Sequence, residues 1–269
     1  EIPLRLVGSE MCIRDRDITI QQLRDEGYKA FYVAVGLQKA SALGIEGEEL
    51  SGVVSGLDLL RGVNKGELSS LQGDTVVIGG GNAAIDVART AIRLGNGSVN
   101  MFCLEKDDEM PTVPDEKNAG IEDGVIINNC WGPKRILGED GKVTGVEFMR
   151  CKSVRNAQGK FAPVYDENET ITVACSNVLV AIGQRSDYGA LLAGTKAETS
   201  DGRIIPCDEV TFQSAEPDIF IGGDCATGPQ YTIDAIASGR EGAVSIHRFV
   251  NVGQSLTIHR NTRKFVTLD

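Results

Sequence analysis

Residues Thr75–Leu94 read TVVIGGGNAAIDVARTAIRL, and this stretch decides the fold. The β-branched run Thr75–Ile78 predicts a buried strand, and Asn82–Leu94 predicts a helix with one apolar stripe. The turn between them, Gly79–Ala84, has the form G-x-G-x-x-A. A strand, this glycine pattern and a helix, in that order, form the fingerprint of a dinucleotide-binding site. We therefore predict such a site here; the alternative is a glycine-rich turn without a ligand.

Each position of this fingerprint has a physical role. Gly79 permits the tight turn, and Gly81 lets the backbone approach a pyrophosphate. Ala84 allows the helix to pack close to the strand. The helix begins at Asn82 and Ala83, so this end offers free N–H groups to phosphate oxygens.

A carboxylate follows the next predicted strand, Ser98–Leu104. This residue, Glu105, can accept hydrogen bonds from the hydroxyls of an adenosine ribose, and it repels a 2′-phosphate. Its position therefore favours NAD over NADP. The alternative is a solvated charge beside Lys106 and Asp107.

Strands alternate with helices along much of the chain, which is typical of parallel α/β sheets. Further strands are predicted at Ala30–Val35, Val125–Asn128, Val178–Ile182 and Ile219–Ile221. Further helices are predicted at Ile18–Glu26, Ser51–Leu60 and Asp115–Glu122, and a long last helix has the apolar stripe Ile233, Ile236, Ala243, Ile246 and Val250. Two strands, Lys142–Cys151 and Thr170–Cys175, flank a polar turn near Asn156–Gly159. The predicted fold class is α/β, with Rossmann-like parallel sheets and a small antiparallel β layer.

A second candidate site follows the strand at Ile219–Ile221. Gly223 and Asp224 come directly after its end, and a new helix starts at Gln230, Tyr231 and Thr232. The acid can bind a ribityl or ribose hydroxyl. The positive end of the helix dipole would stabilise the negative charge that a reduced flavin carries near N1. The alternative is a connection between strand and helix that binds nothing.

Composition limits the possible partners. The formal net charge is −11 without a basic block, so we expect no nucleic-acid binding. No apolar run reaches the ~18 residues of a membrane span, so we expect no membrane insertion. The 7 cysteines form no C-x-x-C pair, which suits free thiols in a reducing cytoplasm. We interpret His247, His259 and Trp131 as structural or solvated residues, and Asp107–Glu109 as a solvated face rather than a metal site.

The first residues follow no helix, strand or signal-peptide pattern. Glu1–Arg16 reads EIPLRLVGSEMCIRDR, and Leu6–Asp15 matches the translation of a transposase-type sequencing adapter, CTC GTG GGC TCG GAG ATG TGT ATA AGA GAC. We interpret residues 1–16 as a sequencing artefact. The alternative is an irregular N-terminal arm of the native protein.

The two candidate sites, in this order, resemble those of the two-dinucleotide-fold FAD/NAD(P) oxidoreductases, most closely the small subunit of glutamate synthase and its relatives. The resemblance extends from about Asp17 to Val250. It is carried by AVGLQKASALGIEGEE (Ala34–Glu49), VVIGGGNAAIDVARTAIRLG (Val76–Gly95), EMPTVPDE (Glu109–Glu116), VLVAIGQRSD (Val178–Asp187) and FIGGDCATGPQYTIDAIASGREGAVSI (Phe220–Ile246).

The resemblance implies that a nicotinamide cofactor binds at Gly79–Ala84 and passes hydride to FAD. Electrons would then reach iron–sulfur clusters outside this chain, on a partner domain or subunit, and a larger catalytic subunit as acceptor. It further implies that Gly223 and Asp224 contact FAD and that Gln230–Thr232 lie beneath the isoalloxazine. Ala34, Gly36 and Gly183 would lie in loops that approach the two cofactors. No catalytic side chain and no metal ligand is implied.

Three departures from the family pattern matter. The paired arginines that bind an NADP phosphate correspond to Leu104 and Glu105, so we expect NADH. No C-x-x-C is present, so the chemistry of the related thioredoxin reductases is not expected. The opening strand of the FAD domain, its G-x-G-x-x-G and an N-terminal cysteine-rich segment are also missing, so we expect an N-terminally truncated FAD domain.

We accordingly divide the chain into five parts: 1–16 as the artefact, 17–60 as part of a discontinuous FAD domain, 61–188 as the NAD(P) domain, 189–250 as the return to the FAD domain and 251–269 as a tail or linker. Three functions remain open at this point. The first is an NADH-dependent flavoprotein oxidoreductase, with an NADPH-dependent relative as a variant. The second is a non-catalytic dinucleotide-binding module. The third, a dehydrogenase with a single Rossmann domain, is disfavoured by the second glycine–acid–helix site.

Overall fold

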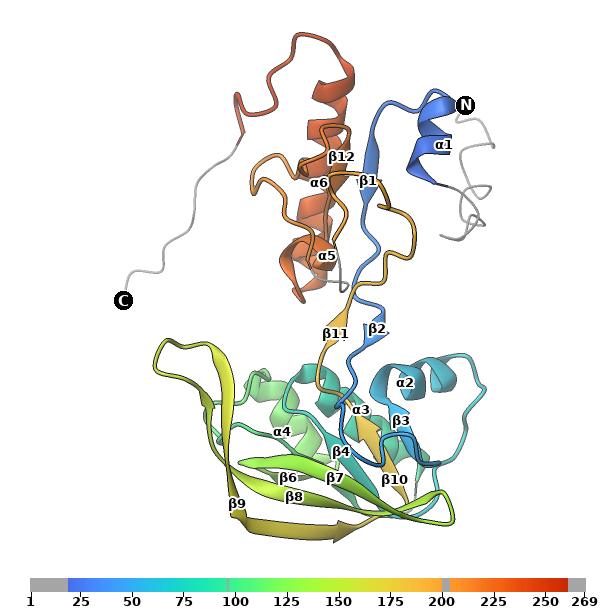
Figure 1. Cartoon of the computed structure of the whole chain (residues 1–269), viewed down its shortest axis with the longest axis vertical. Helices are drawn as coiled ribbons and strands as arrows, with labels where there is room; N and C mark the ends of the chain where they lie inside the picture. Colours follow the sequence, from blue (N-terminus) through green and yellow to red (C-terminus); the bar gives the residue numbers. More distant parts are fainter. Residues whose placement is uncertain (1–18, 96, 200–203, 261–269) are drawn as a thin grey trace. The chain divides into compact units, whose positions relative to one another are not determined.

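The structure is a computed structural model that describes residues 19–95, 97–199 and 204–260 (Figure 1). Segment 1–16, interpreted as an adapter, lies outside the described residues. The chain divides into two compact units. One is continuous, Ala40–Gln184, and the other joins the segments Glu1–Lys39 and Arg185–Asp269. The second unit is thus discontinuous, as expected for the predicted FAD domain.

A five-stranded parallel sheet forms the centre of the unit Ala40–Gln184. Its strands, in spatial order, are β3 (Val53–Ser55), β10 (Asn177–Val180), β4 (Thr75–Ile78), β5 (Val99–Phe102) and β6 (Ile126–Asn128). All residues of β4 are buried. Strands covered on both faces are expected to be apolar throughout, which explains the unbroken run TVVI.

Both faces of this sheet are covered (Figure 1). Helices α2 (Gly56–Asn64) and α3 (Asn82–Leu94) pack on one face, and α4 (Pro114–Glu122) packs against α3. An antiparallel sheet of β7 (Trp131–Glu139), β8 (Lys142–Arg155) and β9 (Phe161–Ala174) packs on the other. At that interface the rings of Phe102 and Phe148 stack with centroids 4.1 Å apart. The predicted α/β class with an antiparallel layer is confirmed.

The antiparallel layer is larger than predicted. Strands β8 and β9 continue past the predicted ends to the turn at Asn156–Gly159. Strand β7 was not predicted, because Gly132 and Pro133 within it are typical of a loop. Gly132 belongs there because an added Cβ would lie 2.3 Å from the Tyr165 ring on β9.

The prediction of a helix at Ser51–Leu60 is wrong in its first half. Val53–Ser55 forms strand β3, which pairs with β10, and α2 begins only at Gly56. Ser55 explains the switch, because its Oγ accepts a hydrogen bond from the N–H of Asp58 and caps α2. As β3 and α2 belong to this sheet, the unit boundary lies at Ala40 and not at residue 61.

The discontinuous unit is built on two parallel strands, β1 (Phe31–Val33) and β12 (Ile219–Ile221). Helices α1 (Ile20–Asp25), α5 (Asp224–Thr227) and α6 (Thr232–Val250) belong to it. Arg24 on α1 binds Asp218 at 2.7 Å, just before β12, so the two segments are joined by charge as well as by packing.

Helix α6 does not bury the apolar stripe that the sequence analysis assigned to it. Its buried residues are Ser238, Gly242 and Ser245, whereas Ile233 and Ile236 are 72% and 67% exposed in the described part of the chain. The reason is the Tyr32 ring on β1. An added Cβ at Gly242 would lie 2.2 Å from that ring, so only small residues fit between α6 and the strands.

The chain passes between the units in two short strands, β2 (Lys39–Ala40) and β11 (Gln184–Arg185), which pair with each other. Among the described residues, no helix combines the length and the apolar character that a membrane crossing requires.

Candidate nucleotide-binding sites

The first site lies at the carboxyl edge of the five-stranded sheet. Strands β4, β5, β6 and β10 end level with one another, since Ile78 pairs with Phe102 and Val180, and Phe102 pairs with Asn128. The segments that follow these strands therefore meet at one edge. Open α/β sheets bind their ligands at this edge.

The glycine turn after β4 is closed in by its neighbours on one side. Gly79 has φ +147°, and an added Cβ would lie 2.3 Å from the carbonyl oxygen of Ala181. An added Cβ at Gly80 would lie 2.7 Å from Oε2 of Glu105 and 3.0 Å from Cβ of Cys103. The sequence analysis assigned no role to Gly80, although three consecutive glycines could have suggested one.

The other side of the turn is open. An added Cβ at Gly81 would meet no atom within 4 Å. Gly81 is also the N-cap of α3 and makes no side-chain capping bond. Asn82 and Ala83 are exposed, while Ala84 is fully buried against the sheet. This end of α3 is therefore open to an anion, which its amides and dipole favour.

The Asn82 side chain links two segments of this unit. Its Oδ1 accepts hydrogen bonds from Oγ1 of Thr112 at 2.7 Å and from the N–H of Val113 at 2.8 Å. Val113 is the N-cap of α4, so Asn82 joins the starts of two helices. Oδ1 of Asn82 is thus occupied within the protein.

Glu105 is half-buried, and its carboxylate lies near Gly80. Its carbonyl oxygen accepts hydrogen bonds from the N–H of Cys130 at 3.1 Å and from Nδ2 of Asn129 at 3.2 Å. Burial, with a smaller contribution from the Glu105 charge, raises the pKa of the Cys103 thiol to about 12, so this thiol stays protonated. The sequence analysis missed Asn129, although a polar residue directly after a strand at this edge is a recognisable signal.

Gly183 also lies beyond the end of a strand at this edge. It has φ +129° and is exposed, three residues after β10 ends at Val180. Its carbonyl oxygen accepts a hydrogen bond from the N–H of Ser41 at 3.0 Å. The structure thus brings Glu105 and Gly183 to the same edge of the sheet as the predicted residues of the fingerprint.

The second site lies in the discontinuous unit, at the carboxyl end of β1 and β12. Val33 pairs with Ile221, so the segments Ala34–Gly36 and Gly222–Asp224 follow the two strands at the same end. Gly36 has φ +68° and Gly223 has φ +66°, which only glycine adopts without strain. Asp224 is half-buried and Ala34 is exposed.

The start of α6 is fixed to this end by Ser238, which the sequence analysis missed. Its Oγ accepts a hydrogen bond from the N–H of Gly223 at 2.8 Å. Gln230, Tyr231 and Thr232 are exposed at the start of α6. The carboxylate of Asp234 accepts from the N–H of Tyr231 at 3.2 Å, so part of the positive helix end is already balanced.

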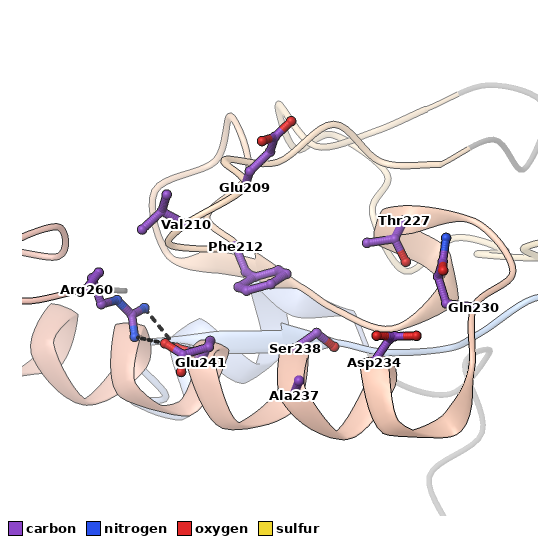
Figure 2. A pocket seen from close by; sticks show the side chains of 10 residues that line it. All are labelled: Glu209, Val210, Phe212, Thr227, Gln230, Asp234, Ala237, Ser238, Glu241 and Arg260. Carbon is purple, nitrogen blue, oxygen red and sulfur yellow. Dashed lines mark hydrogen bonds and ion pairs between the residues drawn. The ribbon is translucent and has the colours of Figure 1, made fainter. Parts of the chain in front are cut away.

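A cleft of about 340 Å³ runs along α6 in the same unit (Figure 2). Of the predicted residues, Gln230 lines it, together with Asp234, Ser238 and Phe212. Arg260 closes one end; its side chain is only 2% exposed and binds Glu241 at 2.8 Å. The acidic and amide groups of the walls suit a ligand that carries hydroxyl groups. Among the described residues, no three His, Cys, Asp or Glu side chains could hold a metal ion.

Comparisons with known proteins agree with this geometry. The family described as "Pyridine nucleotide-disulphide oxidoreductase" matches residues 9–239. The NADP(+)-dependent formate dehydrogenase subunit beta of Moorella thermoacetica is 32% identical over 241 residues, which are 88% of this chain and 34% of that protein. The glutamate synthase [NADPH] small chain of Escherichia coli K12 is 30% identical over 253 residues, which are 88% of this chain and 53% of the relative. The chain thus spans about a third to a half of the length of these relatives.

Two solved structures share the fold. Lactococcus lactis thioredoxin reductase has a TM-score of 0.63 at 20% identity, covering 83% of this chain and 66% of its own. Mycobacterium tuberculosis FprA, solved in complex with NADPH, has a TM-score of 0.66 at 16% identity, covering 86% and 65%. At these identities the likeness concerns the fold.

Proposed function

Since this chain belongs to the pyridine nucleotide-disulphide oxidoreductase family, we propose that it is part of a FAD-dependent oxidoreductase that takes hydride from NADH. One observation carries the proposal: the Glu105 carboxylate lies against Gly80 in a glycine turn at the carboxyl edge of the parallel sheet. That edge is where such sheets bind dinucleotides.

The turn after β4 fits the phosphates of a dinucleotide. The open side of Gly81 lets a pyrophosphate approach the backbone, and the amides of Asn82 and Ala83 begin α3 there. Gly79 and Ala84 serve by their small size, because they let α3 start close to the sheet. These roles need no side-chain acid or base, so binding and orientation are the contribution of this unit.

The choice of NADH over NADPH rests on Glu105. Its carboxylate can accept hydrogen bonds from the two ribose hydroxyls, whereas a 2′-phosphate would bring like charges together. The formate dehydrogenase and glutamate synthase relatives carry NADP or NADPH in their names, so this proposal separates the chain from them. Gly183, at the same edge, is assigned to the loop that approaches the nicotinamide.

FAD, when bound, supplies the acceptor for the hydride. In this chain we assign Gly223 and Asp224, which follow β12, to contacts with FAD. Ala34 and Gly36 belong to the neighbouring loop after β1, which would approach FAD from the other strand. The glycine conformations and the half-buried Asp224 at the shared strand end fit a hydroxyl-bearing ligand. Gln230–Thr232 would face it from the start of α6.

The rest of the electron path is proposed from the relatives. Their names describe subunits of a formate dehydrogenase and a glutamate synthase. We propose that iron–sulfur centres on a partner domain or subunit, and a larger catalytic subunit, accept the electrons. A cytoplasmic location belongs to this proposal and is supported by six cysteines that are free in the described residues.

A second candidate is a dinucleotide-binding module without catalytic activity. It is favoured by one observation: the complete glycine turn and Glu105 lie in a continuous unit, Ala40–Gln184, that has its own core. This candidate needs the nucleotide site alone.

The test uses the purified full chain. Calorimetric titration with NADH and with NADPH should give at least tenfold tighter binding of NADH, and Glu105→Gln should bring the two dissociation constants together. Incubation with FAD and gel filtration should leave a yellow protein that anaerobic NADH bleaches. A colourless protein that binds NADH would support the second candidate, and failure to bind either dinucleotide would overturn both. Tighter binding of NADPH would refute the assignment of Glu105.

A further inference from the structure

The carbonyl oxygen of Glu105 is enclosed by the chain that links β6 to β7. The sheet ladder ends with the N–H of Cys103 donating to Asn128 at 3.1 Å, and it resumes with the N–H of Trp131 donating to Cys103 at 2.9 Å. Between these two bonds, Asn129 and Cys130 form a bend, and Cys130 has the left-handed φ of +64°. This bend wraps around a single backbone oxygen of the neighbouring loop.

Asn129 makes the shortest side-chain hydrogen bond to this carbonyl oxygen, which the thiols of Cys103 and Cys130 also approach, at 3.7 Å and 3.8 Å. Its Nδ2 donates to the carbonyl oxygen of Glu105 at 3.2 Å and lies 3.3 Å from Sγ of Cys103. One amide group has two N–H donors, which these two contacts occupy. The only backbone partner of the same carbonyl among the described residues is the N–H of Cys130, at 3.1 Å.

The position of this carbonyl constrains the backbone from which the Glu105 side chain extends. A peptide group is planar, so holding the carbonyl restricts ψ of Glu105 and keeps its Cα beside the glycine turn, where the carboxylate lies near Gly80. The loop that follows is held separately: Lys106 and Glu109 pair with each other at 3.2 Å, and Lys117 on α4 binds Asp107 at 2.6 Å. Asn129 therefore acts on the carboxylate without touching it.

We propose that Asn129 is a positioning residue for dinucleotide selectivity, which holds Glu105 where it binds the ribose hydroxyls of NADH and repels a 2′-phosphate. The inference rests on the proposed function of Glu105. Loss of one hydrogen bond that orients a charged group should weaken NADH binding about fivefold. A carboxylate released from Gly80 also repels a 2′-phosphate less, so NADPH binding should stay the same or improve.

The chain offers a matched control one residue earlier. Nδ2 of Asn128 donates to the carbonyl oxygens of Met101 and Ile126, both at 3.3 Å, and both are backbone contacts away from Glu105. Asn128→Ala removes the same kind of side chain from the same strand end. It should leave the ratio of NADH to NADPH affinity unchanged.

The experiment is a double-mutant cycle on the full chain, read by calorimetric titration with NADH and NADPH. Asn129→Ala should lower the affinity ratio about five- to tenfold in the wild-type background and leave it unchanged in the Glu105→Ala background. Asn129→Asp keeps the volume but loses the donor. It should lower the affinity ratio in the same way, and it replaces Asn129→Ala in the cycle if that variant fails to fold. An unchanged ratio in both Asn129 variants, or an equal change with and without Glu105, overturns the inference. If the wild type binds neither dinucleotide, it is the proposed function that fails.

Discussion

Two alanine substitutions in the glycine turn should separate stability from nucleotide binding. In Gly79→Ala the new Cβ would lie 2.3 Å from the backbone oxygen of Ala181, at φ +147°. Neither segment can move away easily, because the N–H of Gly79 donates to the carbonyl oxygen of Phe102 at 2.9 Å and the N–H of Ala181 donates to that of Ile78 at 2.8 Å. Backbone strain and the steric clash together should cost about 3–5 kcal/mol. For a unit of this size, that corresponds to a drop of roughly 6–20 °C in Tm.

Gly81→Ala should have the opposite profile. The added Cβ meets no atom within 4 Å, and φ is −95°, an ordinary value for any residue. Loss of a favourable glycine N-cap and reduced entropy of the unfolded chain nearly cancel, so stability should change by no more than about 0.5 kcal/mol. The methyl group would instead occupy the open side of the turn, where a pyrophosphate approaches, and NADH binding should weaken at least tenfold.

The assay pairs thermal denaturation, followed by circular dichroism, with calorimetric NADH titration for both variants and the wild type. The reasoning is refuted if Gly79→Ala melts at the wild-type temperature, because the carbonyl of Ala181 would then not confine the turn. It is equally refuted if Gly81→Ala binds NADH as tightly as the wild type. In that case the dinucleotide does not approach the backbone at Gly81.

Three further predictions concern the unit Ala40–Gln184. Phe148→Ala removes a fully buried ring that stacks on Phe102, and should lower the free energy of unfolding by about 3–5 kcal/mol in a urea titration. Hydrogen bonds from Lys134 and Arg135 lower the pKa of Glu147 from 4.5, so the stability it contributes is present above that pH and is lost as the pH falls through the lowered value. Acid titration below about pH 4.5 should therefore destabilise the wild type more than Glu147→Gln; equal losses would contradict this. Cys103, whose pKa is raised to about 12, should resist iodoacetamide at pH 8 in the folded protein and react after unfolding, as peptide mass spectrometry can show.

The elements whose local sequence and packing agree were predictable. Strand β4, helix α3 and strand β12 have the predicted bounds, because a buried parallel strand must be apolar and a glycine turn must follow it. Strand β7 was not predictable by the same reasoning. Its glycine, proline and charged residues give no strand period, and what holds it is pairing with β8 over nearly its whole length.

Helix α6 shows why periodicity alone can locate a helix and still not identify its buried face. The apolar residues Ile233 and Ile236 indicated a buried stripe, but the space beside the strands is limited by the Tyr32 ring. A close approach selects small residues at helical spacing, here Ser238, Gly242 and Ser245. No local pattern reveals which tyrosine faces a helix more than two hundred residues later.

In the first site, too, some residues could be predicted from their own segment and others depend on neighbouring strands. The fingerprint gave Gly79, Gly81 and Ala84 because their roles depend on the turn itself. Gly80 and Asn129 matter only because β5 lies beside β4 and β6 lies beside β5, which brings Glu105 to the turn and Asn129 to Glu105. Local sequence marks such residues as candidates, but it does not show which residue of a neighbouring strand they meet. The selectivity of this site should therefore depend on substitutions in the loop after β6 as well as on the glycine motif itself, and the double-mutant cycle through Glu105 measures that dependence.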